Sequence, residues 1–119
     1  MRYVDGFVMV VPKKTLRAYM AMAGKAGKIW RQHGALEYRE SAGDDLQSKY
    51  GLPFPKLLKL KRNETAVFSW IVYKSRAHRD RVNAKVMKDP RLAKMMDPKK
   101  PLFDMKRMTY GGFDIVVDQ

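Results

Sequence analysis

The sequence predicts an α+β fold of the ferredoxin-like type, β-α-β-β-α-β, with two helices on one face of a four-stranded antiparallel sheet. The stretch Glu64–Pro90 has the pattern of an apolar strand that runs directly into a basic helix, and Arg2–His33 shows the same strand–helix order. Ala35–Gly43 and Arg107–Val117 supply two further strands. The 119 residues suffice for a single domain, 1–119, with a substantial core, but not for two domains.

The first strand, Arg2–Val11, carries apolar residues on both of its alternating rows. Thr15 is placed to cap a helix that extends to about His33. The buried stripe of this helix follows helical spacing and comprises Leu16, Tyr19, Met20, Ala23, Ala26, Trp30 and His33. Gly24 and Gly27 each weaken a helix by about 1 kcal/mol relative to alanine, so they indicate a close approach of the helix to the sheet.

The second predicted strand, Ala35–Gly43, is followed by residues 44–63, which show no clear period. Three leucines in this segment suggest that part of it packs, as an edge strand: Leu57, Leu58 and Leu60. The pair Gly111-Gly112 in the last strand indicates a bulge or a close contact with another backbone.

The central strand, Thr65–Tyr73, is rich in β-branched and aromatic residues, and both of its rows are largely apolar. Because a strand with one wet face alternates with polar residues, we expect both faces of this strand to be covered. Ser75 fits the N-cap of a helix to about Lys88. The inner side of that helix is marked by His78, Val82 and Val86, and Asp89-Pro90 begins a short helix, Arg91 to Met96.

The composition limits the classes of function. The formal net charge of +13 allows a polyanionic partner, and residues between Asp5 and Glu37 include no acidic residue. The chain has no cysteine, which excludes disulfides, thiol catalysis and thiolate metal sites. It has no apolar run of membrane-spanning length and no signal-peptide pattern, so we expect a cytoplasmic protein without a membrane partner.

Several stretches resemble a bacterial family catalogued as domain of unknown function 1428: YVDGFV, AGKIWRQHGALEYRE, FSWIVYKSRAHRDRVNAKVMKDPR and RMTYGGF. The resemblance covers nearly the whole chain. It implies membership of the dimeric α/β-barrel superfamily, whose members pair two ferredoxin-like sheets into a barrel. Relatives in that superfamily include cofactor-free monooxygenases, haem-degrading enzymes and muconolactone-isomerase-like proteins. The resemblance therefore implies a fold and a homodimer, but no particular reaction.

The apolar rows favour a homodimer independently of any resemblance. Two helices cover one face of the predicted sheet and leave the other face to solvent. Whichever row faces the helices, large apolar side chains remain on the other, among them Val8 or Phe7, Phe68 or Ile71, and Phe113. An exposed apolar patch of that size is typical of an interface, and a second copy could cover it.

The sequence predicts one candidate ligand site, a small pocket between helix and sheet bounded by Tyr38, Trp70, His78 and Arg107, with Arg39 or Arg107 as a forked donor. His78 is either a structural histidine or a proton carrier, and it is the sole candidate catalytic residue. His33 is expected to cap free carbonyls at its helix end. No HxH, HxxxH or HxxE spacing exists, so we expect no metal and no cofactor.

Three functions stay open at this point. The first is binding of a small planar or anionic ligand in the pocket, and the second is cofactor-free oxidation or isomerisation of a small aromatic or acidic compound there. The third is weak, non-specific RNA binding through the basic helices. A sheet platform for RNA is not expected, because the rows that we expect to be buried contain Phe7, Phe68, Trp70 and Tyr110. For Glu37, Arg39 and Glu40, a cross-strand ion pair is expected.

Overall fold

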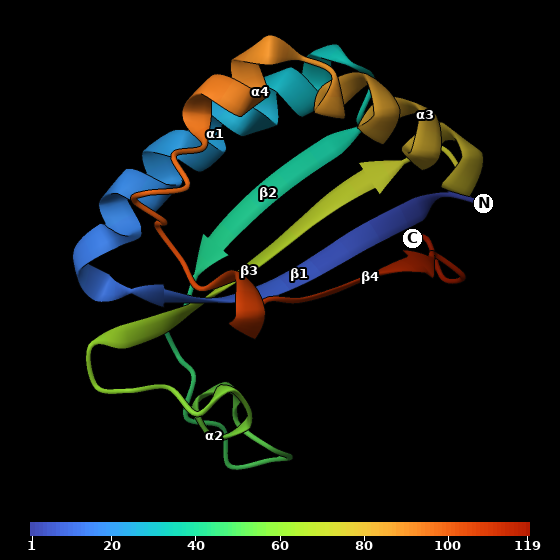
Figure 1. Ribbon diagram of the computed structural model, residues 1–119. Helices are drawn as coiled ribbons and strands as arrows, with labels where there is room; N and C mark the ends of the chain where they lie inside the picture. The colour runs from blue at the N-terminus through green and yellow to red at the C-terminus, as the bar shows by residue number, and fades with distance from the viewer.

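The computed structural model describes residues 1–119 and confirms the α+β, ferredoxin-like plan (Figure 1). Four antiparallel strands lie in the order β2-β3-β1-β4. The strands are β1 (Tyr3–Pro12), β2 (Glu37–Ala42), β3 (Glu64–Tyr73) and β4 (Thr109–Asp114). The helices are α1 (Leu16–Gln32), α2 (Phe54–Leu58), α3 (Arg76–Met87) and α4 (Pro90–Met95), with 3-10 turns η1 (Lys13–Thr15) and η2 (Met105–Arg107).

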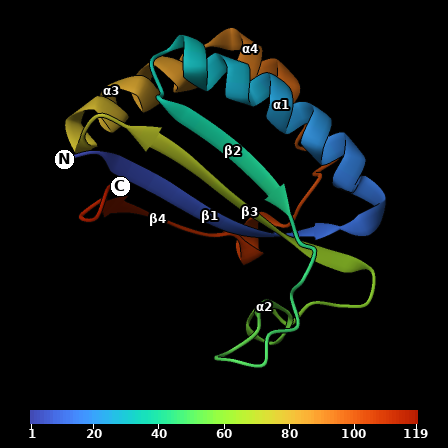
Figure 2. The same ribbon diagram turned by 180° about the vertical axis from the view of Figure 1, so that it is seen from behind.

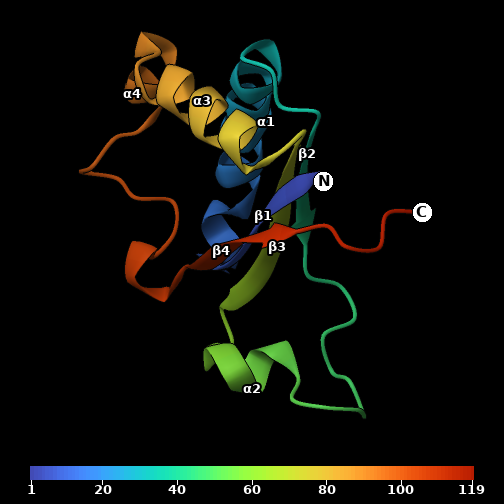
Figure 3. The same ribbon diagram turned by 90° about the vertical axis from the view of Figure 1, so that its right-hand side faces the viewer.

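The helices α1, α3 and α4 cover one face of the sheet, whereas α2 lies beyond one end of it (Figures 1 and 3). The two longest strands, β1 and β3, pair over ten residues at the centre of the sheet. One row of side chains from these strands meets the helices in two buried clusters. From the sheet these clusters contain Tyr3, Met9, Val11, Val67, Ile71 and Tyr73; from the helices, Tyr19, Ala23, Ile29, Val82 and Val86.

The other sheet face is buried only in part: Val10, Ala66 and Val72 are buried there, and Leu46 and Phe54 of the 44–63 segment lie beside Ala66 and Phe68. The expectation that both faces of the central strand are covered therefore holds for only part of this face. This open face carries the second row of the central strands, including Val8 and Trp70. Phe68 is 47% exposed there, and Phe113 is 60% exposed. Tyr110, on the helix side of the edge strand β4, is also exposed, and one side of its ring stacks on Phe7.

The helix starts are set partly by the expected caps. The Ser75 hydroxyl accepts from the His78 N–H at 3.1 Å, and the Asp89 carboxylate accepts from the Arg91 N–H at 2.9 Å. Thr15 differs from expectation because its hydroxyl makes no cap bond and donates instead to the Leu102 carbonyl at 2.9 Å.

The second strand and the last strand are shorter than the sequence predicts. Ala35 and Leu36 belong to the turn that leads into β2, and Arg107 lies in the 3-10 turn η2 before β4. β4 ends at Asp114, the partner of Tyr3, and beyond it the Ile115 N–H donates to the Arg2 carbonyl at 2.9 Å.

The segment 44–63 does not form the expected edge strand, since Pro53 and Pro55 favour the first turn of a helix and α2 forms there. Arg107 ties this segment to the sheet. Its guanidinium donates to the Leu58 and Lys59 carbonyls and to Glu64, the first residue of β3, at distances between 2.7 and 3.2 Å. The ion pair lowers the pKa of Glu64.

Two glycines, Gly27 and Gly112, allow a tyrosine ring to lie directly against the backbone. A Cβ on Gly27 would lie 2.6 Å from the Tyr38 ring, so α1 reaches β2 only because Gly27 has no side chain, whereas a Cβ on Gly24 would meet no atom within 4 Å. A Cβ on Gly112 would collide with the Tyr3 ring. The register of β4 continues through Gly111-Gly112 without a bulge, so the close contact is with a side chain.

The two α1 glycines form a matched pair for a stability test. Gly24→Ala is expected to raise the free energy of unfolding by about 0.5–1 kcal/mol, because alanine favours the helix and meets no neighbour. Gly27→Ala is expected to lower the free energy of unfolding by about 1–2 kcal/mol. The cost of overpacking against the Tyr38 ring is larger than the stability that alanine adds to the helix. Urea denaturation of both variants measures the difference. Equal effects at the two positions would contradict the close approach at Gly27.

Candidate functional site

A cavity of about 380 Å³ lies between the helix-facing side of the sheet and helices α1, α3 and α4. The segment between α4 and β4 borders it as well. Most of its lining is apolar, including Phe7, Trp30, Ile71, Met95, Phe103 and Met108. A concave, mainly apolar cavity with a few polar groups is the usual form of a small-molecule site.

Glu40 on β2 provides one polar group of this cavity. The Tyr19 hydroxyl of α1 donates to Glu40 Oε1 at 2.5 Å, and both side chains border the cavity together with Ser69. Burial raises the pKa of the Glu40 carboxyl, although the hydrogen bonds from Tyr19 and Ser69 act in the opposite direction. Burial beside Glu40 also raises the pKa of Tyr19, so this hydroxyl stays a hydrogen-bond donor.

A second polar cluster lies at the β1–α3 side of the cavity. Asp5 is only 3% exposed, and the Arg79 guanidinium donates to its Oδ1 at 3.1 Å. The same guanidinium lies 5.0 Å from the Tyr3 ring centre. Burial raises the pKa of Asp5, while the Arg79 charge and a hydrogen bond from Asn83 lower it in part.

Asn83 on α3 completes this cluster. Its Oδ1 accepts from the Trp30 indole at 3.2 Å and from the Tyr73 hydroxyl at 3.1 Å, so one amide oxygen links α1, α3 and β3. Burial raises the pKa of Tyr73, which keeps its hydroxyl protonated. The cavity therefore has hydrogen-bond acceptors at two places, Glu40 and Asp5. Arg79, which is paired with Asp5, is the cation beside the second.

The residues expected at the site do not converge on one pocket. Tyr38 lines the cavity, where its ring packs against Trp30 with ring centres 6.0 Å apart. Arg39 borders the cavity by its place on β2, but its side chain shares the open face with Glu37, 3.8 Å away. Trp70 lies on the open face as well, and its indole donates to Glu37 Oε1 at 3.0 Å.

His78 and Arg107 lie at opposite ends of the sheet, away from the cavity lining. His78 Nδ1 accepts from the Lys74 N–H at 3.0 Å at the start of α3, and desolvation together with nearby cations lowers the pKa of its ring. Strand alternation explains why Trp70 does not line the cavity. Tyr38 pairs with Ile71 on the helix-facing side, so Trp70, one residue away, points to the other face.

Other expectations about charged residues also change. His33 does not cap carbonyls; its Nε2 lies 2.8 Å from the Asp89 carboxylate, which links α1 to α4. The ion pair of Arg39 is with Glu37 on the same strand, and Glu40 turns inward to Tyr19. Asp5 and Glu40 are acidic residues on the strand rows that face the helices. The sequence could identify them as site residues only if it also showed which row of each strand faces the helices.

Two further structural findings bear on the class of protein. No group of three or more His, Asp or Glu side chains lies close enough to share a metal ion. No helix has the length and apolar character needed to cross a membrane.

Comparisons with known proteins place the chain among bacterial sequences of unknown function. The family model described as "Protein of unknown function (DUF1428)" matches residues 2–105. The uncharacterized protein YbaA of Escherichia coli K12 is 43% identical over 119 residues, which cover 100% of both chains, and YbaA of Shigella flexneri gives the same values.

A solved structure supports the fold. The crystal structure of a NIPSNAP family protein with unknown function from Agrobacterium tumefaciens superimposes with a TM-score of 0.59. The match covers 94% of this chain and 86% of that chain, at 16% sequence identity. At this identity the likeness shows the fold alone.

The buried carboxyl of Glu40 predicts a pH-dependent stability. Because the pKa in the folded state lies above the ordinary value of 4.5, the folded protein loses stability as the pH rises from that value through the folded-state pKa. Each tenfold difference in the acid dissociation constant of Glu40 between the folded and unfolded states changes the free energy of unfolding by about 1.4 kcal/mol. The melting temperature of Glu40→Gln, relative to the wild type, should therefore rise between pH 4 and pH 8. A constant or falling difference would show that the Glu40 carboxyl is not destabilised by burial.

Proposed function

The chain belongs to the DUF1428 family of proteins of unknown function, and we propose that it binds a small, planar, mostly apolar molecule in the cavity between helices and sheet. The observation that supports this proposal is the combination of about 380 Å³ of largely apolar space with the Glu40–Tyr19 pair at its wall. Burial of apolar ligand surface supplies the affinity, and a few polar groups orient the ligand.

The polar groups favour a neutral ligand with a hydrogen-bond donor over an anion. Glu40 and Asp5 are both acidic, and the Arg79 charge is already compensated by Asp5 at 3.1 Å. A ligand anion would meet two carboxyl groups in a partly desolvated space, which is unfavourable. Of the two ligand classes suggested by the sequence, planar and anionic, the planar class fits this cavity better.

A neutral planar fluorophore tests the proposal. N-phenyl-1-naphthylamine should bind with a saturable rise in fluorescence, and more tightly than the anionic 1-anilinonaphthalene-8-sulfonate at high salt. Ala26→Phe, which fills the cavity from α1, should weaken binding at least about tenfold, or about 1.4 kcal/mol. Titrations monitored by fluorescence measure all three affinities.

Two control variants accompany that titration. Ala84→Phe adds the same side chain at an exposed position of α3, and His78→Gln alters a histidine outside the cavity lining; neither should change the probe affinity. Thermal melts establish that Ala26→Phe is folded. Equal probe affinity in a folded Ala26→Phe variant would show that the cavity is not the binding site.

A second candidate function is a cofactor-free enzyme that isomerises its ligand, and Glu40 favours it. A buried carboxyl with a raised pKa can take a proton from one carbon of a bound ligand and return it to another. Tyr19, which donates to this carboxyl, would hold it in one orientation. Glu40→Gln separates the two functions, because it keeps the shape of the cavity and removes the proton acceptor.

We also propose that two copies associate through the open sheet face. Phe68 is 47% and Phe113 60% exposed on this face, next to the less exposed Val8 and Trp70. A patch of large apolar side chains on a central strand is typical of an interface, and a two-fold axis would set the same patch of both copies against each other.

Introduction of a charge on this face tests the homodimer. Wild-type protein should sediment as a dimer at micromolar concentration, and Phe68→Glu should raise the dissociation constant at least about tenfold. Met87→Glu is the control, because Met87 is 64% exposed on α3, which covers the opposite face of the sheet. Analytical ultracentrifugation measures both. A wild-type monomer would refute the homodimer.

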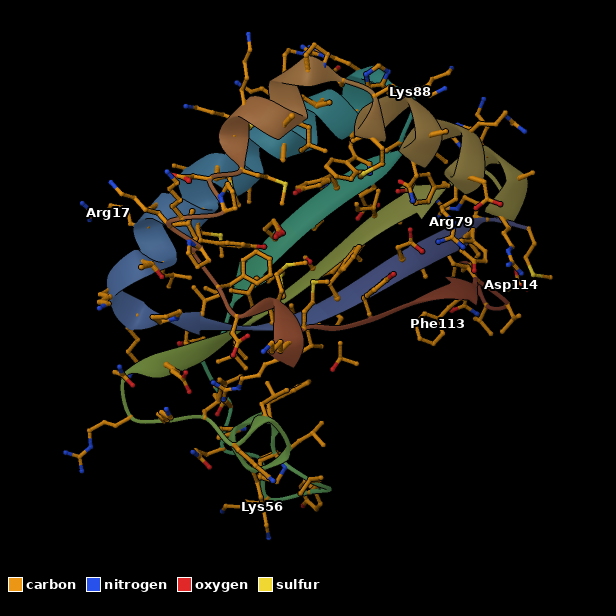
Figure 4. All side chains as sticks on the ribbon, in the orientation of Figure 1. Arg17, Lys56, Arg79, Lys88, Phe113 and Asp114 are labelled. Atoms are coloured by element: carbon orange, nitrogen blue, oxygen red, sulfur yellow. The ribbon has the colours of Figure 1, made fainter.

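Non-specific RNA binding has weaker support. Phe113 lies on the sheet face opposite the helices, whereas Arg17 and Lys88 point outward from α1 and the end of α3 (Figure 4). A protein that stacks on a base and also contacts its phosphate needs aromatic and basic side chains on the same surface. The net charge of +13 is therefore the remaining argument for this function.

A further inference from the structure

Two carboxyl groups reach the ligand cavity from different strands. Figure 2 shows β3 between β2 and β1, beneath α1, α3 and α4. Glu40 on β2 pairs with Ser69 of β3, whereas Asp5 on β1 pairs with Ile71, two residues further along β3. All four residues line the cavity. The two carboxyl groups therefore lie on a diagonal that crosses the central strand between Ser69 and Ile71.

The strand register sets the length of this diagonal. Neighbouring strands lie about 4.8 Å apart and two residues span about 6.7 Å along a strand, so the Cα atoms of Glu40 and Asp5 lie about 12 Å apart. Side chains stand roughly perpendicular to a sheet, so the carboxyl groups keep much of this spacing. A hydrogen bond of about 2.8 Å at each end leaves about 6 Å between two ligand donors. This is the length of two fused aromatic rings.

Aromatic side chains occupy the opposite diagonal of the same four positions. Phe7 of β1 pairs with Ser69, and Tyr38 of β2 pairs with Ile71. Both aromatic residues line the cavity. Two small residues of α1 line it as well, Ala23 and Ala26. A flat ring system can therefore lie along the carboxyl diagonal, with apolar groups on both sides of it.

Each carboxyl group keeps acceptor capacity for a ligand. A carboxylate can accept about four hydrogen bonds. Within the protein, Glu40 accepts from the Tyr19 hydroxyl on Oε1 at 2.5 Å, and Asp5 accepts from Arg79 on Oδ1 at 3.1 Å. One further side chain donates to each carboxyl group. Both groups can therefore accept at least one more hydrogen bond from the cavity side.

We infer that the ligand of this cavity is a neutral molecule of two fused aromatic rings with one N–H or O–H donor at each end, bound by Glu40 and Asp5 at the same time. The inference rests on the proposed function and adds the length of the ligand and the placement of its donors. Glu40 and Asp5 thus determine specificity. A ligand without one of the donors leaves a buried acceptor without that partner, which weakens its binding.

Three naphthalenes of similar size test the inference on the wild-type protein. 2,6-Diaminonaphthalene has a donor at each end, 2,3-diaminonaphthalene has both donors at one end, and 6-methoxy-2-aminonaphthalene has one donor and one acceptor. The 2,6-diamine should bind at least about tenfold more tightly than either of the others, as expected for one additional hydrogen bond to a charged group. The fluorescence of the naphthalenes at pH 8, where aromatic amines are uncharged, measures the three affinities.

Glu40→Gln should reverse the preference at one end of the site. Because the Tyr19 hydroxyl donates to position 40, the amide oxygen of the variant faces Tyr19 and its N–H groups face the ligand. Those N–H groups oppose a ligand donor but can bond a methoxy oxygen. 6-Methoxy-2-aminonaphthalene should therefore bind this variant at least as tightly as the 2,6-diamine does.

Two further variants complete the test. Glu37→Gln makes the same change on the same strand outside the cavity lining, so it should keep the wild-type order of affinities. Asp5→Asn should abolish the tenfold advantage of the 2,6-diamine at the other end of the site. Thermal melts establish which variants are folded, and the comparison of ligands on the wild-type protein does not depend on any variant.

The outcomes separate this inference from the proposed function. Equal affinities of the wild type for the three naphthalenes, or an unchanged order in a folded Glu40→Gln variant, would overturn the ligand with two donors. If Ala26→Phe still weakens the binding of these naphthalenes, the cavity remains the binding site. Absence of binding by the naphthalenes and by N-phenyl-1-naphthylamine would overturn both.

Discussion

The two-residue alternation of β1 and β3, with apolar residues on both rows, is the constraint on which the rest of the structure depends. One row packs under α1, α3 and α4 and forms the two buried clusters. The same alternation places the other row, with Phe68 and Trp70, on a face that the chain covers only in part, since Val10 and Ala66 are buried there but Phe68 is 47% exposed. Core and open face are therefore two consequences of one pattern.

The cavity follows from how the helices lie on that sheet. Gly27 brings α1 against Tyr38 at one point, while Met95, Phe103 and Met108 from α4 and the segment after it line the space on the other side. Space remains between these contacts, and Asp5 and Glu40 point into it from the strands. Each carboxyl keeps a hydrogen-bonding partner, Arg79 or Tyr19, which makes its burial tolerable.

The charge of the protein is segregated from both apolar regions. Arg17 of α1 and Lys88 at the end of α3 point outward, whereas Arg79 of α3 borders the cavity and is paired with Asp5 (Figure 4). A ligand site and a polyanion site would thus lie on different surfaces of the molecule.

The sequence by itself determined the element order, the main helix caps and the apolar rows. Ser75, Asp89-Pro90 and the stripe from Tyr19 to Ala26 act within a few residues, so local rules sufficed. The sequence could not decide which row of each strand faces the helices, because both are apolar, and the site depended on that choice. It therefore grouped Trp70, His78 and Arg107 with Tyr38, although alternation and distance along the strands keep them apart. Only the tertiary structure brought Glu40 to Tyr19 and Asp5 to Arg79, because these contacts join residues 21 and 74 positions apart.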